Sequence, residues 1–197
     1  MALTTLDIKE PGLNVLPPGV ERHTVCAGGL TGLQIFPDDQ LEVLNDEGNQ
    51  ICEIICFDKN GKSELGILNL KENSKKSFIK EILKGNDESS LITNLQLKKR
   101  NLNINNSKSS IIFDKDTPYG EKIKLKSKDK CYVIFSAPKN EMLISDQNPS
   151  SDLTIFIKRA KINKDKELSV IPDPVYDPSY EKNIYRQTCI SYQVKEG

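Results

Sequence analysis

Two closely spaced cysteines and one histidine are the side chains in this sequence best suited to hold a metal ion. Cys52 and Cys56 are four residues apart, a spacing that brings side chains together on one face of a helix. The residues around them are β-branched and apolar, so we expect a strand, in which the two backbones lie about 13 Å apart, too far to share an ion. His23, the single histidine, cannot supply both a ligand and a base. The pattern indicates core thiols and a surface or edge histidine.

A second set of reactive side chains lies in expected turns. Asp46 and Glu47 precede Gly48 and could present two carboxylates to a ligand, although acidic residues are also common in tight turns for conformational reasons. Asp152 and the polar run 147–149 could border a pocket, and turn formation alone also explains them. The sequence contains no glycine-rich phosphate-binding loop. These residues predict no catalytic centre in this chain.

Short strands separated by turn residues should position these side chains. Strand-like runs are expected at 20–26 and 30–36. Two further runs, at 41–44 and 50–57, flank the Asn-Asp-Glu-Gly sequence of 45–48, which predicts a hairpin because its glycine is available for positive φ.

The spacing of apolar residues then changes to a helical period. Ser74 can cap a first helix, whose apolar side chains are Phe78, Ile79, Ile82 and Leu83. A shorter helix is expected after Ser90, and its apolar face would consist of Leu91, Ile92 and Leu95. The polar stretch 98–110 predicts an exposed loop.

Strand character returns in the second half. In 122–126, Ile123 and Leu125 should face inward while three lysines form the wet face of an edge strand. The continuous apolar run 132–135 predicts a central strand buried on both faces, and further strands are expected at 111–113 and 153–158. The fold class is therefore mainly β, a β-sandwich or barrel with one or two short inserted helices.

The charge of the chain is balanced but unevenly distributed. Residues 1–58 hold 2 basic and 10 acidic side chains, whereas 59–130 hold 17 basic and 9 acidic ones. We expect the basic middle to fold beside the acidic first third, and with 6% aromatic residues and no tryptophan we expect no nucleic-acid partner. No apolar run is long enough to span a membrane, so no membrane partner is expected. The 5 cysteines, an odd number without a signal peptide, favour a cytoplasmic protein with reduced thiols.

Composition divides the chain into four parts. We expect a proline-punctuated extended leader at 1–19, a β-rich domain at 20–160 and a charged, proline-containing linker at 161–187. A new strand begins within 188–197 without a returning partner, which predicts the start of a following, truncated domain and a longer parent protein.

Several segments together resemble the urea-carboxylase-associated family. Segments 16–22, 27–29, 38–43 and 46–50 carry the likeness in the first half of the chain. Ala137-Pro138 with Met142, then 147–153 and 173–178, continue it, and 190–197 resembles the opening of a second copy. The order and spacing resemble the N-terminal copy of this domain in proteins that end in a glycine-cleavage T-protein-like aminomethyltransferase.

Three functional hypotheses follow, the first two from the resemblance and the third from the uneven charge distribution. The first is an accessory or ligand-binding domain, not catalytic by itself, of a folate-dependent aminomethyltransferase-like protein of one-carbon metabolism that acts on a methylated amine. The second, from the carboxyguanidine-deiminase relatives, is a metal-assisted C–N hydrolase. The third is an assembly module whose basic middle docks on an acidic surface.

The first hypothesis implies its own partners and site. We expect no cofactor in this segment, tetrahydrofolate in the parent protein, and as partners the remaining parent domains and a small amine or guanidino ligand. The candidate ligand-binding residues are Asp46, Gln50, Pro138, Gln147 and Asp152. No catalytic or metal-binding residue is predicted.

Overall fold

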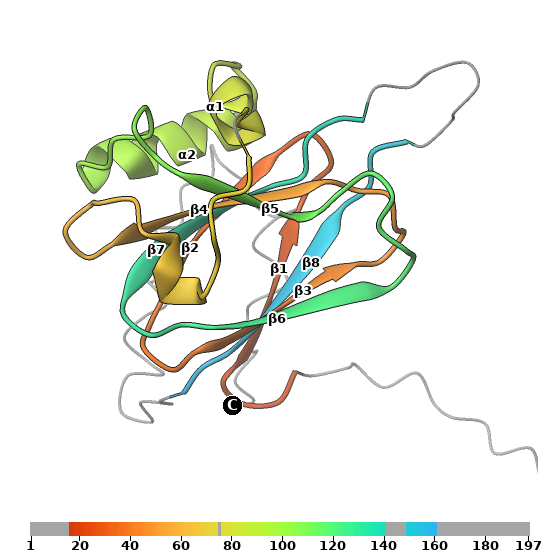
Figure 1. The fold of residues 1–197 in the computed structure, drawn as a ribbon, viewed down its shortest axis with the longest axis horizontal. Helices are drawn as coiled ribbons and strands as arrows, with labels where there is room; N and C mark the ends of the chain where they lie inside the picture. Colours follow the sequence, from red (N-terminus) through yellow and green to blue (C-terminus); the bar gives the residue numbers. More distant parts are fainter. Residues whose placement is uncertain (1–15, 75, 141–148, 161–197) are drawn as a thin grey trace, which may run out of the picture. The chain divides into compact units, whose positions relative to one another are not determined.

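Two four-stranded antiparallel sheets form the framework of the domain (Figure 1). The computed structural model describes residues 16–74, 76–140 and 149–160. The first sheet has the order β1 (Val20–Val25), β8 (Leu153–Lys158), β3 (Gln40–Asn45) and β6 (Glu121–Lys126). The second has the order β2 (Leu30–Ile35), β7 (Cys131–Ser136), β4 (Cys52–Asp58) and β5 (Ser109–Phe113). The expected mainly β sandwich is confirmed.

The apolar side chains of both sheets meet between them. From the first sheet come residues such as Val43 and Ile155, and from the second Ile54 and Phe135, each fully buried. β6 alternates as expected, with Leu125 buried and its lysines exposed, and it lies at a sheet edge. All six residues of β7 are buried because this strand is central and both of its faces are covered.

Three short helical elements connect β4 to β5. They are η1 (Leu65–Leu68), α1 (Phe78–Ile82) and α2 (Glu88–Lys99). In Figure 1, α1 and α2 cover the second sheet on the side away from the first. A second apolar cluster fills this layer, with Ile55 and Phe57 of β4 packing near Ile79 and Leu97. The helices thus bury the outer face of the second sheet.

The predicted hairpin between the third and fourth strands is wrong. β3 pairs with β6 and β8, whereas β4 pairs with β5 and β7 in the other sheet. The intervening loop crosses between the sheets, and its backbone bonds go to the segment before β6: Asn49 N donates to Thr117 O at 2.8 Å. Gly48 has φ of 74°, and a Cβ there would lie 2.7 Å from Tyr119 N. The residues predicted to form a hairpin turn, 45–48, therefore lie in the loop that crosses from the first sheet to the second.

The predicted first helix exists, but Ser77 caps it rather than Ser74. Ser77 Oγ accepts from Lys80 N at 3.4 Å, while Ser74 Oγ donates to Lys76 O. The buried Glu53 carboxylate also accepts from Ile79 N, at 2.7 Å, and so fixes the first turn of α1 to the sheet. The local cap of Ser77 and the contact from Glu53 both stabilise this start of the helix, and the sequence pattern does not reveal the second.

The second helix is longer than predicted and faces the opposite way. Asp87 caps α2, which extends through Lys99 into the stretch predicted as a loop. Leu91, Ile92 and Leu95, predicted as its buried face, are exposed.

Hydrogen bonds explain the orientation of α2. Ser90 Oγ donates to Ile82 O at 2.8 Å and Asn94 Nδ2 donates to Leu83 O at 3.0 Å. These carbonyls lie at the end of α1; Ile82 O also accepts from Gly85 N at 2.8 Å, whereas the bond from Asn94 supplies a partner to Leu83 O. The polar side of α2 therefore lies inward.

The basic middle of the chain lies against the acidic first third, as expected. Lys122 and Lys124 each lie 3.6 Å from Glu42, and Lys126 lies 2.8 Å from Asp38. These exposed pairs stabilise the fold weakly. No helix in the described ranges is long and apolar enough to cross a membrane. The linker and following domain predicted beyond residue 160 lie outside the described residues.

The orientation of α2 predicts a difference between two leucines two positions apart. Leu97→Ala should lower the free energy of unfolding by about 2–4 kcal/mol, because it leaves a cavity beneath the helix. Leu95→Ala should change it by less than about 0.5 kcal/mol in dilute solution, because this side chain is exposed. Urea unfolding of both variants measures the difference, and equal losses would contradict this orientation.

Candidate functional site

The predicted ligand-binding residues that the structure describes lie at one end of the sandwich. Asp46 and Gln50 are in the crossover between β3 and β4, Pro138 follows β7, and Asp152 precedes β8. Gln147 lies outside the described residues. We call this the Gln50 end; it lies where β3 and β7 finish and β4 and β8 begin.

Gln50 joins the two sheets at this end. Its fully buried side chain donates from Nε2 to Pro138 O at 2.9 Å and accepts at Oε1 from Ser151 N at 2.8 Å. Asn45 Nδ2 in turn donates to Gln50 O at 2.9 Å. The fold therefore brings together Gln50 and Pro138, two of the predicted ligand-binding residues. The hydrogen bond between them links the two sheets at this end.

Asp46 and Asp152 are each engaged in a different contact. Asp46 Oδ2 accepts from Thr154 Oγ1, and Asp152 Oδ1 accepts from Ala27 N, both at 2.8 Å. Two buried oxygens next to Gln50, Asn45 Oδ1 and Ser151 Oγ, have no hydrogen-bond partner among the described residues. The Gln50 end thus has two polar atoms without a partner in the described residues, whereas the carboxylates of Asp46 and Asp152 each accept a hydrogen bond from another segment of the chain.

Cys52, Cys56 and His23, the metal-ligand candidates of the sequence, do not gather around a common point. Cys52 and Cys56 lie on β4 with their side chains fully buried, as the strand interpretation predicted, and His23 lies on β1 of the other sheet. A hydrogen bond with Cys131, together with burial, raises the pKa of Cys56, and burial raises that of Cys52. Protonated core thiols are poor ligands and nucleophiles. Within the ranges that the structure describes, no three His, Cys, Asp or Glu side chains are grouped to hold a metal ion.

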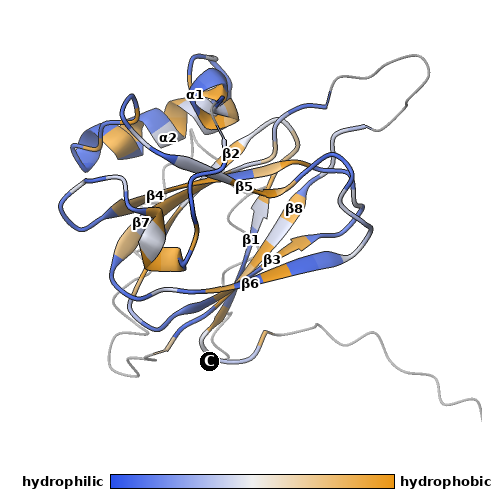
Figure 2. Cartoon of the chain, in the orientation of Figure 1, coloured by the Kyte–Doolittle hydropathy of each residue, from blue (hydrophilic) through white to orange (hydrophobic). Residues whose placement is uncertain are grey.

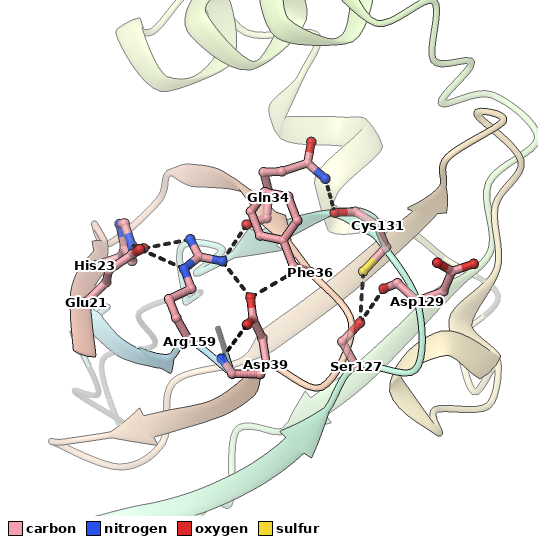
Figure 3. Close-up of polar contacts among 10 residues, drawn as sticks. Glu21, His23, Gln34, Phe36, Asp39, Ser127, Asp129, Cys131 and Arg159 are labelled. Carbon is pink, nitrogen blue, oxygen red and sulfur yellow. Dashed lines mark hydrogen bonds and ion pairs between the residues drawn. The ribbon is translucent and has the colours of Figure 1, made fainter. Parts of the chain in front are cut away.

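The opposite end of the sandwich is organised around Arg159, shown in Figure 3. Its Nε and Nη2 donate to the two carboxylate oxygens of Glu21 at 2.7 and 2.8 Å. Nη1 donates to Asp39 Oδ2 at 2.7 Å and to Gln34 O at 3.0 Å. Because Glu21 belongs to β1 and Gln34 to β2, one guanidinium spans both sheets. We call this the Arg159 end.

Charge and burial at the Arg159 end reinforce one another. The Asp39 side chain is 2% exposed and also accepts from Ala160 N and Phe36 N. Burial raises the pKa of Glu21, but hydrogen bonds from His23 and Arg159 outweigh it and lower that pKa to about 2. Burial disfavours the charged form of Arg159 too, yet its bonds to Glu21 and Asp39 leave its pKa raised. These shifts keep Glu21 and Arg159 ionised, which suits a structural role.

An open groove of about 420 Å³ lies beside the start of β7. The Arg100 guanidinium stacks 4.5 Å from the centre of the Tyr132 ring, and Lys130 adds a second positive charge. Asp58, the acidic residue lining this groove, accepts from Asn60 N and Lys62 N of its own turn. Arg100 and Lys130 have no carboxylate partner in the described part of the chain, so the groove suits an anion.

The sequence alone did not reveal either of these features. Arg159 lies next to the expected linker, and its partners are far away in the chain. Arg100 falls in the stretch predicted as an exposed loop. The one sequence signal that could have indicated Arg159 is a basic residue at the boundary of a strand in a chain with the acidic turn 38–39.

Gln50 provides a direct test of the tie at its end. Gln50→Ala should lower the free energy of unfolding by about 2–4 kcal/mol, because Pro138 O and Ser151 N would lose their partner while buried. The exposed Gln40→Ala should change it by less than about 0.5 kcal/mol. Chemical unfolding of the two variants measures both values, and a Gln50→Ala loss as small as that of the control would contradict the role assigned to Gln50.

Glu21 should make stability depend on acid pH. Its folded pKa of about 2 lies below the ordinary value of 4.5, so the unfolded chain takes up a proton here before the folded chain does. The stabilisation is fully present above about pH 4.5 and is lost as pH falls towards 2. Glu21→Gln should be less stable than wild type at pH 6 and lose less stability between pH 5 and 3. Urea unfolding across this range measures both, and parallel pH profiles would contradict the assignment.

Comparison with known proteins shows a similarity to part of an enzyme. No family model matches the chain. Over 190 residues the chain is 30% identical to the trimethylamine-oxide aldolase of Ruegeria pomeroyi, an alignment that covers 96% of this chain and 24% of the aldolase. The chain therefore spans about a quarter of the length of the curated relative it matches, and it is similar to one part of an enzyme whose name refers to a methylated amine oxide.

Proposed function

We propose that this chain is the N-terminal accessory domain of a longer protein that acts on a methylated amine. In this proposal the reaction is a folate-dependent aminomethyl transfer, tetrahydrofolate binds outside this segment, and the remaining parent domains are the partners of the sandwich. The domain contributes structure and ligand contacts and is not catalytic by itself.

The observation that carries the proposal is the alignment with trimethylamine-oxide aldolase. It includes nearly the whole chain but about a quarter of the enzyme. A match of this kind is what one domain of a larger amine-processing protein would give. It also agrees with the resemblance drawn from segments such as 46–50 and 147–153.

The contacts of the reactive groups support an accessory role. The Cys52 and Cys56 thiols pack in the core, and His23 Nε2 lies 3.0 Å from Glu21 within the Arg159 cluster. Each of these groups is used to hold the fold. Cys52, Cys56 and His23 do not line the groove of about 420 Å³ beside β7.

Electrostatics favours the Gln50 end over the groove as the place for an amine or guanidino ligand. Arg100 and Lys130 line the groove and would repel a cation. At the Gln50 end, Asn45 Oδ1 and Ser151 Oγ are acceptors without partners in the described residues.

Turnover of trimethylamine N-oxide tests the proposal. A methyl group that leaves nitrogen as an aldehyde is released as formaldehyde, so formaldehyde is the product to measure. The 197-residue chain should release none above the buffer blank. The longer protein made from the same reading frame should release it and should need tetrahydrofolate to pass the one-carbon unit on.

Two results would contradict the proposal. Formaldehyde release by the 197-residue chain alone would make this segment catalytic. Ammonia release from a guanidino compound, together with at least one equivalent of bound metal after purification without a metal-binding tag, would support the C–N hydrolase instead.

A further inference from the structure

Helix α2 presents an apolar surface to solvent. Leu91, Ile92 and Leu95 are 51%, 44% and 66% exposed, while Ser90 and Thr93 are buried against the sheet. In Figure 2, α2 carries both hydrophobic and hydrophilic colours along its length. Contiguous exposed apolar side chains commonly mark interaction surfaces.

The exposed face of α2 is charged at its two ends and apolar in its middle. At 3.6 residues per turn, Glu88 and Lys99 lie on the same side of the helix as the three exposed apolar residues. We call this face the α2 stripe: Glu88, Leu91, Ile92, Leu95 and Lys99. Glu88 and Lys99 are exposed and form no ion pair within the part of the chain that the structure describes.

We propose that two copies of this chain associate through the α2 stripe, with the two helices antiparallel. Positions 88 and 99 lie equally far from the midpoint of the helix, as do 92 and 95. A two-fold axis through this midpoint therefore places Glu88 of each copy beside Lys99 of the other, and Ile92 beside Leu95. The same patch meets itself, as a two-fold symmetric dimer requires.

Charge makes a second copy the best occupant of the stripe. Antiparallel helices place the negative end of each helix dipole beside the positive end of the other. A parallel arrangement would instead place Glu88 against Glu88 and Lys99 against Lys99. The charges of the α2 stripe therefore complement those of a second copy when the two helices are antiparallel, and not when they are parallel.

The size of the stripe predicts a weak dimer. α2 has 12 residues and is about 18 Å long, so one helix pair buries less than the ~800 Å² per partner of a stable interface. We expect a dissociation constant in the micromolar range or above. It should rise with salt concentration, because salt screens the two ion pairs.

Sedimentation equilibrium of the 197-residue chain over a wide concentration range tests the association. Leu95→Glu places a charge at the centre of the interface and should raise the dissociation constant at least tenfold. Tyr119, which is 84% exposed and lies outside the helices, provides the matched control. Tyr119→Glu should leave the dissociation constant unchanged, and far-ultraviolet circular dichroism checks that both variants are folded.

Charge reversal tests the antiparallel register. Glu88→Lys and Lys99→Glu should each weaken the dimer, because each places like charges together across the interface. The double variant should restore it to near the wild-type dissociation constant, because each new lysine then meets a new glutamate. Helix dipole effects within one copy would not give this recovery.

Each alternative result has a defined meaning. A chain that stays monomeric at every concentration overturns the proposal, as does a dimer that Leu95→Glu leaves unchanged. A dimer that Leu95→Glu disrupts, but that the double charge reversal fails to restore, overturns the antiparallel pairing. Formation of the dimer does not depend on the function proposed for the longer protein.

Discussion

The guanidinium of Arg159 supplies the directional contact on which the pairing of the two sheets depends. Apolar packing drives the sheets together, but it is non-directional and does not by itself select one alignment. Arg159 donates to Glu21 of the first sheet and to Gln34 O of the second, and its third partner, Asp39, is buried. Burying such charges is costly unless all of them are paired, and here each has a partner. The contacts of Arg159 therefore stabilise one alignment of the two sheets over others, in which these charges would lose their partners.

At the Gln50 end, hydrogen bonds of an uncharged side chain link the two sheets. The Gln50 side chain bonds to backbone on both sides of the sandwich, at Pro138 and Ser151. Because the crossover loop that contains Gln50 passes between the sheets, its polar backbone needs partners in the interior. Residues that looked suited to a ligand therefore have structural roles in the fold. The anion-suited groove, with Arg100 and Lys130, lies at the Arg159 end instead.

The helical layer contains the surface through which we propose that two copies of the chain associate. The inward side of α2 bonds to the end of α1 through Ser90 and Asn94 and also buries Leu97. In this orientation Leu91, Ile92 and Leu95 lie in solvent. The contacts of the inward side thus leave an apolar surface on the outward side, which is the surface proposed for association.

The sequence by itself determined the strands, since alternation in 122–126 and the continuous apolar run in 132–135 follow from which faces are covered. It also indicated core thiols at Cys52 and Cys56. Only the tertiary structure decided that β3 and β4 belong to different sheets, because the crossover depends on bonds from Gln50 to residues about 90 and 100 positions away. Likewise, the outward face of α2 and the partners of Arg159 depend on contacts between distant segments. Periodicity reports burial along one element, and it carries no information on which other element supplies a hydrogen-bond partner.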